Sequence, residues 1–462
     1  MTELCRACRE CLAGQKPQVS GEDVVAVARG DFLLCELTEE RCALCLGVQP
    51  MVFNKYVLDC LDLFVAQSGY AFPTFSFNFR LPSSVKLRQA LCCADQPPFD
   101  VKQSIKGFLN EHFRARWEKP VCTAEEFVIT LSFDNAAEAA HMAQLCSGRP
   151  GRGLEGPTQG QIEMIIAEGN TAMRARFAET ELAQHLDSLR LRVELRAQNV
   201  FVMGRYNKFG RNTSQTVWNI EDGPSLEGSV EEHVSPALRE AFATDAHKFH
   251  AAGREDVDVR MLGRGRPFVV ELVSPRRLST EIDLTAAATT INAATESVRV
   301  SCLTLADKSV LAELSEGAEK KVKAYCALVR FASPPSLQLQ QHISDLRDLA
   351  VRQATPLRVL HRRTLMHRQK IIHAMHLRAV EDGLYMLFLL TSAGTYVKEF
   401  VHGDLQRTLP NLGSLAGAPA DILQLDVLDL FDEAGEALGA FQQLAEGFLP
   451  QQVPGLNAPK CA

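Results

Sequence analysis

Two carboxylates, Asp256 and Asp258, follow Gly253 closely and could do nucleophilic or acid–base chemistry. A glycine just before them allows a sharp turn, which suits a carboxylate at the mouth of a cleft. Runs rich in β-branched residues flank the glycine- and proline-containing stretch 263–267. They predict a strand, a tight loop and an antiparallel strand over 253–273, with both aspartates on the polar face of the first strand. An ordinary strand with a solvated charged face would show the same pattern.

Four cysteines near the N-terminus form two Cys-x-x-Cys pairs, namely Cys5 with Cys8 and Cys42 with Cys45. Two such pairs, the second followed by Gly47, are what a tetrahedral four-thiolate zinc site needs. Such a zinc has no open position for substrate, so its role would be structural and a zinc-dependent hydrolase is disfavoured. Reduced cysteines without a metal are the alternative, and Cys11 or Cys35 could replace a ligand.

The composition is typical of a globular protein, with 46% hydrophobic and 23% charged residues among 462. This length suggests two or three domains. No apolar run reaches bilayer length and no secretory signal is evident, so we expect an intracellular protein with no membrane partner. In such a protein, 14 cysteines favour metal ligands and buried thiols over disulfides. A net charge of -7 is a weak argument against nucleic-acid binding, because phosphate is read by local basic patches.

Helical and strand-like patterns are mixed along the chain and predict an α/β protein. The N-terminal part contains expected helices at 52–66 and 101–109 and expected strands at 75–81 and 127–133. Glycine and proline are concentrated near 147–160, where we expect a flexible linker. Farther along, expected buried strands cover 323–329 and 384–391, and a helix with regular apolar spacing follows at 397–405.

Two segments combine features that suit RNA. The first is the basic run 200–211, which continues to Trp218 and contains Tyr206 and Phe209. Basic residues between aromatic rings suit phosphate contact and base stacking, although an exposed hairpin with core aromatics would look similar. The second is the basic cluster 355–370, the densest in an otherwise acidic chain and a natural footprint for a phosphate backbone. A solvated basic face is the alternative for that cluster.

The sequence Gly253-Arg254-Glu255-Asp256 resembles the Gly-Arg-x-Asp motif of pseudouridine synthases, in which the aspartate is catalytic. The longer run through Arg260, with the following Gly-Arg-Pro-Phe, is more similar still to one branch. That branch is the archaeal and eukaryotic tRNA pseudouridine synthase family conventionally numbered ten, which modifies the T-arm of tRNA. The resemblance implies that Asp256 is the catalytic residue, with Asp258 as its competitor. Arg254, which comes immediately before the carboxylates, is a candidate to contact the RNA.

Two further motifs support this resemblance and imply substrate-binding roles. Lys323-Ala324-Tyr325 matches a Lys-x-Tyr motif whose tyrosine stacks on the target uracil. The segment from Gly394 to Lys398 resembles the Gly-Thr-Tyr-x-Arg/Lys motif of the TruB-like branch. It implies that Lys398 pairs with Asp256 and that Tyr396 lines the substrate pocket. Without these motifs, Tyr325 would be interpreted as a core residue and Lys398 as an exposed lysine.

The resemblance also implies the architecture. We expect a zinc-binding module at 1–50, a THUMP-like accessory RNA-binding domain at 51–190, and a pseudouridine synthase catalytic domain at 191–462 built on a mixed, mainly antiparallel sheet. In the family the N-terminal paired cysteines are zinc ligands, which assigns that role to the four cysteines above. A generic α/β packing domain is the alternative for 51–190.

The expected function is isomerisation of uridine to pseudouridine in the T-arm of tRNA, at position 55 or else position 54. The reaction needs no catalytic cofactor, so Zn²⁺ would be structural only. We expect a monomer in the cytoplasm, the nucleus or both, with other structured RNAs as further candidate substrates. The alternative is an RNA-binding or processing adaptor that keeps the synthase fold without relying on catalysis.

Overall fold

The computed structural model describes residues 5–13, 16, 24–29, 32–37, 42, 44–82, 84–92, 100–124, 126–135, 189–217, 227–361, 363–381 and 383–447. Contacts divide the chain into two compact units, Met1–Gln198 and Asn199–Ala462. Each unit has its own sheet and its own hydrophobic core. The predicted three-domain boundaries stay predictions, and the one after residue 190 falls within a strand. The predicted linker near 147–160 lies outside the described residues.

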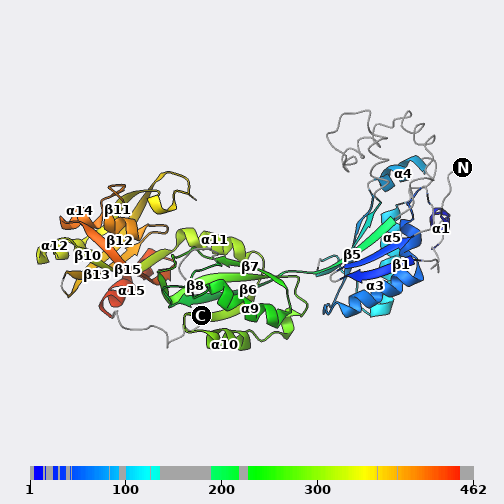
Figure 1. Ribbon diagram of the computed structural model, residues 1–462, viewed down its shortest axis with the longest axis horizontal. Coiled ribbons are helices and arrows are strands. Elements are labelled where there is room, and N and C mark those ends of the chain that lie inside the picture. The colour runs from blue at the N-terminus through cyan, green and yellow to red at the C-terminus, as the bar shows by residue number, and fades with distance from the viewer. Residues whose placement is uncertain are drawn as a thin grey trace. The chain divides into compact units, whose positions relative to one another are not determined.

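The first unit is a five-stranded sheet packed against helices (Figure 1). Its elements are α1 (Arg6–Leu12), β1 (Val24–Arg29), β2 (Phe32–Leu37), α2 (Val48–Val52), α3 (Lys55–Gln67), β3 (Ser76–Arg80), α4 (Ser84–Cys92), α5 (Val101–Trp117), β4 (Phe127–Asp134) and β5 (Leu189–Ala197). The strand order is β1-β2-β5-β4-β3, and only β3 and β4 are parallel. Asn54 and Asp100 cap α3 and α5 through their side chains. The apolar stripes of both helices are buried in the core of this unit.

The second unit is built on a 10-stranded sheet. Its elements are β6 (Val200–Lys208), α9 (Val230–Phe242), β7 (Ala246–Ala251), β8 (Arg260–Val273), η2 (Ser279–Glu281), α10 (Leu284–Ala294), β9 (Val298–Ala306), α11 (Val310–Lys320), β10 (Val322–Phe331), α12 (Leu337–Asp345), β11 (Arg347–Ala354), η3 (Leu357–Val359), β12 (His367–Glu381), β13 (Leu384–Thr391), α13 (Val397–His402), β14 (Thr408–Leu409), α14 (Leu412–Ala416), β15 (Ala420–Phe431) and α15 (Ala434–Gly447). The order is β14-β11-β12-β13-β10-β15-β8-β6-β9, with β7 paired to β8. Only β15 and β8 are parallel, so the prediction of a mixed, mainly antiparallel sheet is confirmed.

Helices cover both faces of this sheet, as the alternation of side chains along β10 shows. Ala324 and Cys326 belong to the core cluster that includes Phe441 of α15. Tyr325 and Ala327 face the other way, into the cluster that contains buried residues of α9, α10, α12, α13 and α14. Tyr325 therefore lies on the same face of the sheet as α13, which carries Lys398.

The predicted hairpin over 253–273 is wrong. Residues Arg260–Val273 form one strand, β8, and both aspartates lie in the loop before it. The positive φ angles of Gly263 (57°) and Gly265 (75°) produce an irregularity within the strand instead of a turn. The pairing of β6 with β8 jumps there, from Tyr206 opposite Arg266 to Lys208 opposite Met261. The same glycine-rich signal predicts a turn or a bulge, and pairing with neighbouring strands on both sides decides between them.

Gly263→Ala is expected to destabilise the second unit by about 2 kcal/mol or more. An added Cβ would overlap the carbonyl oxygen of Leu428 in β15, and φ at this position is left-handed. Gly439→Ala in α15 is the matched control, because its Cβ would meet no atom within 4 Å and a helix interior favours alanine. Urea unfolding of both variants measures the difference. Equal midpoints would contradict the close approach of β8 and β15.

Other expectations are confirmed at the level of elements. The strand predicted at 384–391 is β13, and the strand predicted at 323–329 lies within β10. The helix predicted from 397 is α13, which ends at His402 instead of 405 because Gly403 adopts the left-handed conformation. No described helix has both the length and the apolar character needed to cross a membrane. The THUMP-like character of the accessory region stays a prediction.

Candidate active site and metal centre

The loop from Ala252 to Val259, which carries Asp256, is braced by a buried polar network. Glu255 accepts hydrogen bonds from the Tyr206 hydroxyl at 2.9 Å and from Arg266 Nε at 2.8 Å. Gln215 donates to the Tyr206 oxygen at 2.8 Å and to the carbonyl of Gly253 at 2.9 Å. The side chains of Tyr206, Arg266 and Gln215 are all buried. Tyr206 is thus a core residue, which decides against the stacking interpretation for its ring.

Lys208 fixes the backbone at the catalytic candidate and at the residue after it. Its ammonium group is fully buried and donates to the carbonyls of Thr213 (2.7 Å), Asp256 (3.0 Å) and Val257 (2.9 Å). Three N–H donors thus meet three carbonyl acceptors. Burial lowers the pKa of Lys208 to about 8, against the opposing effect of the carboxylates of Glu255, Asp258 and Asp256.

The carboxylate of Asp256 lies between two cations. Arg358 Nη1 is 3.0 Å from one of its oxygens, and Lys398 Nζ is 3.3 Å from the same oxygen. The side chain is 34% exposed, so it remains accessible from outside. Burial alone would raise the pKa of Asp256, but the charges of Arg358 and Lys398 outweigh it and lower the pKa below its usual range. Asp256 is therefore ionised at neutral pH.

Lys398 bridges both aspartates of the loop. Its ammonium group is 2.9 Å from Asp258 and 3.3 Å from Asp256. The structure therefore brings Lys398 to Asp256, the pairing expected from the motif, although Asp258 is the nearer partner. Asp258 is the more exposed of the two, with 58% of its side chain accessible, which makes it the less protected carboxylate.

The two predicted tyrosines lie on separate elements. Tyr325 is half-buried on β10, and burial raises its pKa to about 12 while the charges of Arg266 and Glu255 act on it. Its hydroxyl therefore stays protonated at neutral pH. Tyr396 caps α13, where Gln353 Nε2 donates to its carbonyl and Gln353 Oε1 accepts from its N–H, both at 2.9 Å. These two hydrogen bonds fix the first turn of α13, which carries Lys398.

Arg254, the predicted RNA contact, is exposed. Its Nη1 donates to the Thr216 hydroxyl at 3.3 Å. The guanidinium group therefore remains available on the surface, one residue from Glu255 and two from Asp256 in the chain.

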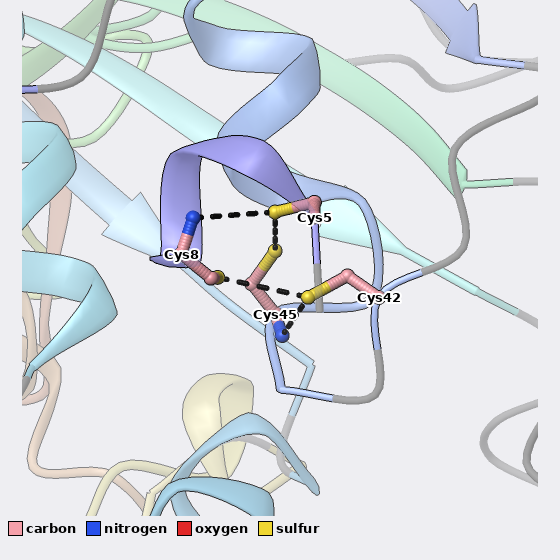
Figure 2. A group of neighbouring side chains, drawn as sticks. All are labelled: Cys5, Cys8, Cys42 and Cys45. Carbon is pink, nitrogen blue, oxygen red and sulfur yellow. Dashed lines mark hydrogen bonds between the residues drawn. The ribbon is translucent and has the colours of Figure 1, made fainter. Parts of the chain in front are cut away.

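The four predicted zinc ligands converge in the first unit (Figure 2). Cys5 and Cys8 come from the start of α1, and Cys42 and Cys45 from the turn before α2. Their sulfur atoms all lie within 4.8 Å of one another. The sulfur atoms of Cys5 and Cys45 are 3.8 Å apart, and those of Cys8 and Cys42 are 3.6 Å apart. A tetrahedral zinc with bonds of about 2.3 Å needs sulfurs separated by roughly 3.8 Å, whereas a disulfide needs about 2 Å.

The surroundings also fit a metal centre. All four cysteines are buried, and Gln49, which is buried as well, accepts a hydrogen bond from the Cys8 thiol through Oε1 at 2.9 Å and donates through Nε2 to Ser104 at 3.0 Å. The cluster could therefore hold a metal ion.

Sequence reasoning missed the partners that complete the site around Asp256. Arg358 was interpreted only as part of the basic cluster, yet it reaches Asp256 and also donates through Nε to Glu399 at 2.8 Å. Lys208 was interpreted only as part of a basic loop. No local signal identifies either contact, because each joins segments far apart in the chain.

The family model described as "Pus10, C-terminal" matches residues 201–430. The mouse protein named tRNA pseudouridine synthase Pus10 is 45% identical over 435 residues, covering 88% of this chain and 82% of that protein. The human protein of the same name is 32% identical over 411 residues, covering 84% of this chain and 77% of that protein. A Methanopyrus kandleri protein of that name is 37% identical over 257 residues, covering 53% of this chain and 58% of that protein.

Among solved structures, a chain in a "Cbf5-Nop10-Gar1 Complex" matches over 53% of this chain and 66% of that chain at 14% identity, with a TM-score of 0.27. That score is too low to carry an argument. The sequence relatives do carry one, and they place the chain among the pseudouridine synthases, which are isomerases. Within that class it belongs to the Pus10 family. The resemblance stated from its motifs is thereby confirmed.

Because the pKa of Lys208 is lowered to about 8, we expect turnover to fall above about pH 8. A lysine is charged below its pKa and neutral above it, and the neutral amine has two N–H groups for three carbonyls, so the loop would loosen. Lys323 is the group to exclude, because burial lowers its pKa to about 8 as well. The check is the pH profile of kcat for the unaltered protein and for Lys323→Gln. A fall that vanishes in Lys323→Gln would assign it to Lys323 and reject the assignment to Lys208.

Proposed function

We propose that the protein converts uridine to pseudouridine in the T-arm of tRNA, with position 55 as the main target and position 54 as the second. The relatives from mouse, human and Methanopyrus kandleri are named tRNA pseudouridine synthases. The observation that carries the proposal is the ionised carboxylate of Asp256, held between Arg358 and Lys398 on a braced loop. A tRNA substrate would place the protein inside the cell, in the cytoplasm, the nucleus or both.

Asp256 would be the catalytic residue. In the reaction the bond from ribose C1′ to N1 of uracil breaks, the base turns while bound, and C1′ bonds to C5. C5 then loses a proton and N1 gains one, so the product is an isomer and no redox agent or energy source is consumed. The carboxylate acts either as a nucleophile on the nucleoside or as a base toward the sugar. Both roles need the ionised form, which Arg358 and Lys398 favour.

Tyr325 and Tyr396 would bind the target base. A uridine must leave its stack to reach Asp256, which costs a few kcal/mol. Stacking on Tyr325 would offset this cost by about 1 to 3 kcal/mol. Tyr396, fixed by Gln353 at the start of α13, would line the pocket next to Lys398.

The exposed basic residues around the site would contact the RNA backbone. His361, Arg363 and His367 of the basic cluster are exposed, and so is Arg254 on the loop. Contacts of this kind supply affinity that depends on salt and not on base sequence. Other structured RNAs are therefore further candidate substrates.

In the first unit, Cys5, Cys8, Cys42 and Cys45 would hold a structural Zn²⁺. Four thiolates would fill the tetrahedral coordination of the ion and leave no open position, so the metal would stabilise the fold and take no part in the reaction. The unit as a whole would serve as the accessory RNA-binding region, as expected for a THUMP-like domain.

The test uses unmodified tRNA transcripts that differ only in the T-arm. The protein is incubated with a transcript carrying uridine at positions 54 and 55, and with transcripts in which either uridine is replaced by cytidine. Pseudouridine is then located by its carbodiimide adduct. The expected result is an adduct that disappears when position 55 is cytidine, or when position 54 is.

Tight binding of every transcript with no adduct would reject the synthase proposal. That result would favour the alternative, an RNA-binding or processing adaptor that keeps the fold without relying on catalysis.

A further inference from the structure

Arg358 is shared between two carboxylates, and one of them is buried. Its Nε donates to Glu399 Oε1 at 2.8 Å, while its Nη1 lies 3.0 Å from Asp256 Oδ2 and 3.2 Å from Asp256 Oδ1. The side chain of Glu399 is 1% exposed, whereas that of Arg358 is 39% exposed. The guanidinium group is thus anchored on its inner side and presents its outer side to Asp256.

Glu399 is poorly placed to stabilise the fold. Its second carboxylate oxygen, Oε2, is buried and has no hydrogen-bond partner among the described residues. A buried carboxylate with an unpaired oxygen carries a desolvation penalty that one ion pair offsets incompletely. A group of this kind calls for an explanation other than stability.

The position of Glu399 in the chain supplies that explanation. It follows Lys398 directly on α13, so one turn of helix serves Asp256 twice: Lys398 contacts the carboxylate itself, and Glu399 holds the arginine that contacts it. Arg358 comes from η3, which connects β11 to β12. An anchored arginine loses less conformational freedom when it binds than a free one does, so it can fix the orientation of Asp256.

We propose that Glu399 and Arg358 are positioning residues for Asp256, with Glu399 acting only through Arg358. This inference rests on the proposed catalytic role of Asp256. It separates Arg358, which is tied to Asp256 and Glu399, from other members of the basic cluster, such as Arg363, which would contact the phosphate backbone. The charged groups around Asp256 are Arg358 from η3, Lys398 and Glu399 from α13, Lys208 from β6 and Asp258 of the same loop.

The first test compares Arg358→Gln with Arg363→Gln, a variant of an exposed arginine in the same cluster. Arg358→Gln is expected to lower kcat about 10- to 100-fold, the factor associated with one hydrogen bond to a charged group. It is also expected to move the acid limb of kcat upward by about 1 pH unit, because an opposite charge beside Asp256 has been removed. Arg358→Lys keeps the charge and should restore the acid limb. Arg363→Gln is expected to raise KM and leave kcat and the acid limb unchanged.

The second test asks whether Glu399 acts through Arg358. Glu399→Gln is expected to lower kcat about 10-fold with little change in KM or in the unfolding temperature. In the Arg358→Gln background it should have no further effect, because its only target is gone.

The outcomes separate the inference from the function on which it rests. Two results would overturn the inference while the unaltered protein makes pseudouridine: an Arg358→Gln variant that changes KM alone, as Arg363→Gln does, or effects of the two substitutions that simply add. If Arg358→Gln fails to fold, Glu399→Gln decides alone, since an unchanged kcat rejects the pair. If the unaltered protein makes no pseudouridine, the proposed function fails first and the inference fails with it.

Discussion

Asp256→Asn is expected to abolish pseudouridine formation, with a loss in kcat of about 10⁴-fold or more. The amide is nearly the same size but can act neither as a nucleophile nor as a base. Affinity for tRNA should stay within a few-fold, because basic residues elsewhere on the surface would supply the phosphate contacts. The measurement is single-turnover product formation together with a binding assay on the same tRNA.

Asp258→Asn is the matched control for this prediction. Asp258 lies in the same loop and contacts the same lysine, at 2.9 Å, but its side chain is more exposed, and among the ion pairs of the described residues it makes none with Arg358. Its loss should weaken the hold on Lys398 and reduce kcat far less than the loss of Asp256. If Asp256→Asn keeps its turnover and Asp258→Asn is inactive, the assignment of the catalytic carboxylate is reversed.

Removing the proposed zinc ion is expected to destabilise the first unit strongly. The four cysteines belong to the same buried core as α2, α3 and α5. Losing the metal that would link them is therefore expected to loosen the packing of most of this unit. Structural zinc contributes on the order of 10 kcal/mol in small zinc modules, and a unit with its own core should lose a smaller part of its stability. We expect about one zinc ion per chain by metal analysis and a lower unfolding temperature after chelation.

Cys42→Ser should reproduce the effect of chelation, because it removes one of four ligands. Cys122→Ser is the control, since this half-buried cysteine lies outside the cluster and a serine can accept the same hydrogen bond from Ala124 N–H. A protein that binds no metal and unfolds identically in both variants would leave the four residues as ordinary reduced thiols.

Local sequence patterns predicted the helices and strands whose buried residues follow one regular spacing along the chain. The continuous apolar run of β13 and the 3.6-residue spacing of α13 each identify an element without reference to the rest of the chain. The spacing of the cysteine pairs predicted the sulfur cluster, because each pair brings its two sulfurs to one point.

The same reasoning failed where a pattern has two structural outcomes. Gly263 and Gly265 allow a hairpin turn or a bulge, and the choice depends on β6 and β15, which the local sequence does not contain. Tyr206 was compatible with stacking on RNA or with the core, and its hydrogen bond to Glu255 decides for the core. Glu399 gave no signal at all, since a glutamate in a short helix is usually solvated.

The most direct test of the central claim is a map of pseudouridine across a complete pool of unmodified tRNAs treated with the purified protein. An ionised Asp256, held by Arg358 and Lys398, predicts new carbodiimide adducts at uridine 55 or 54 of the T-arm and at few other positions. A pool that the protein binds and returns without a single new adduct would contradict the account.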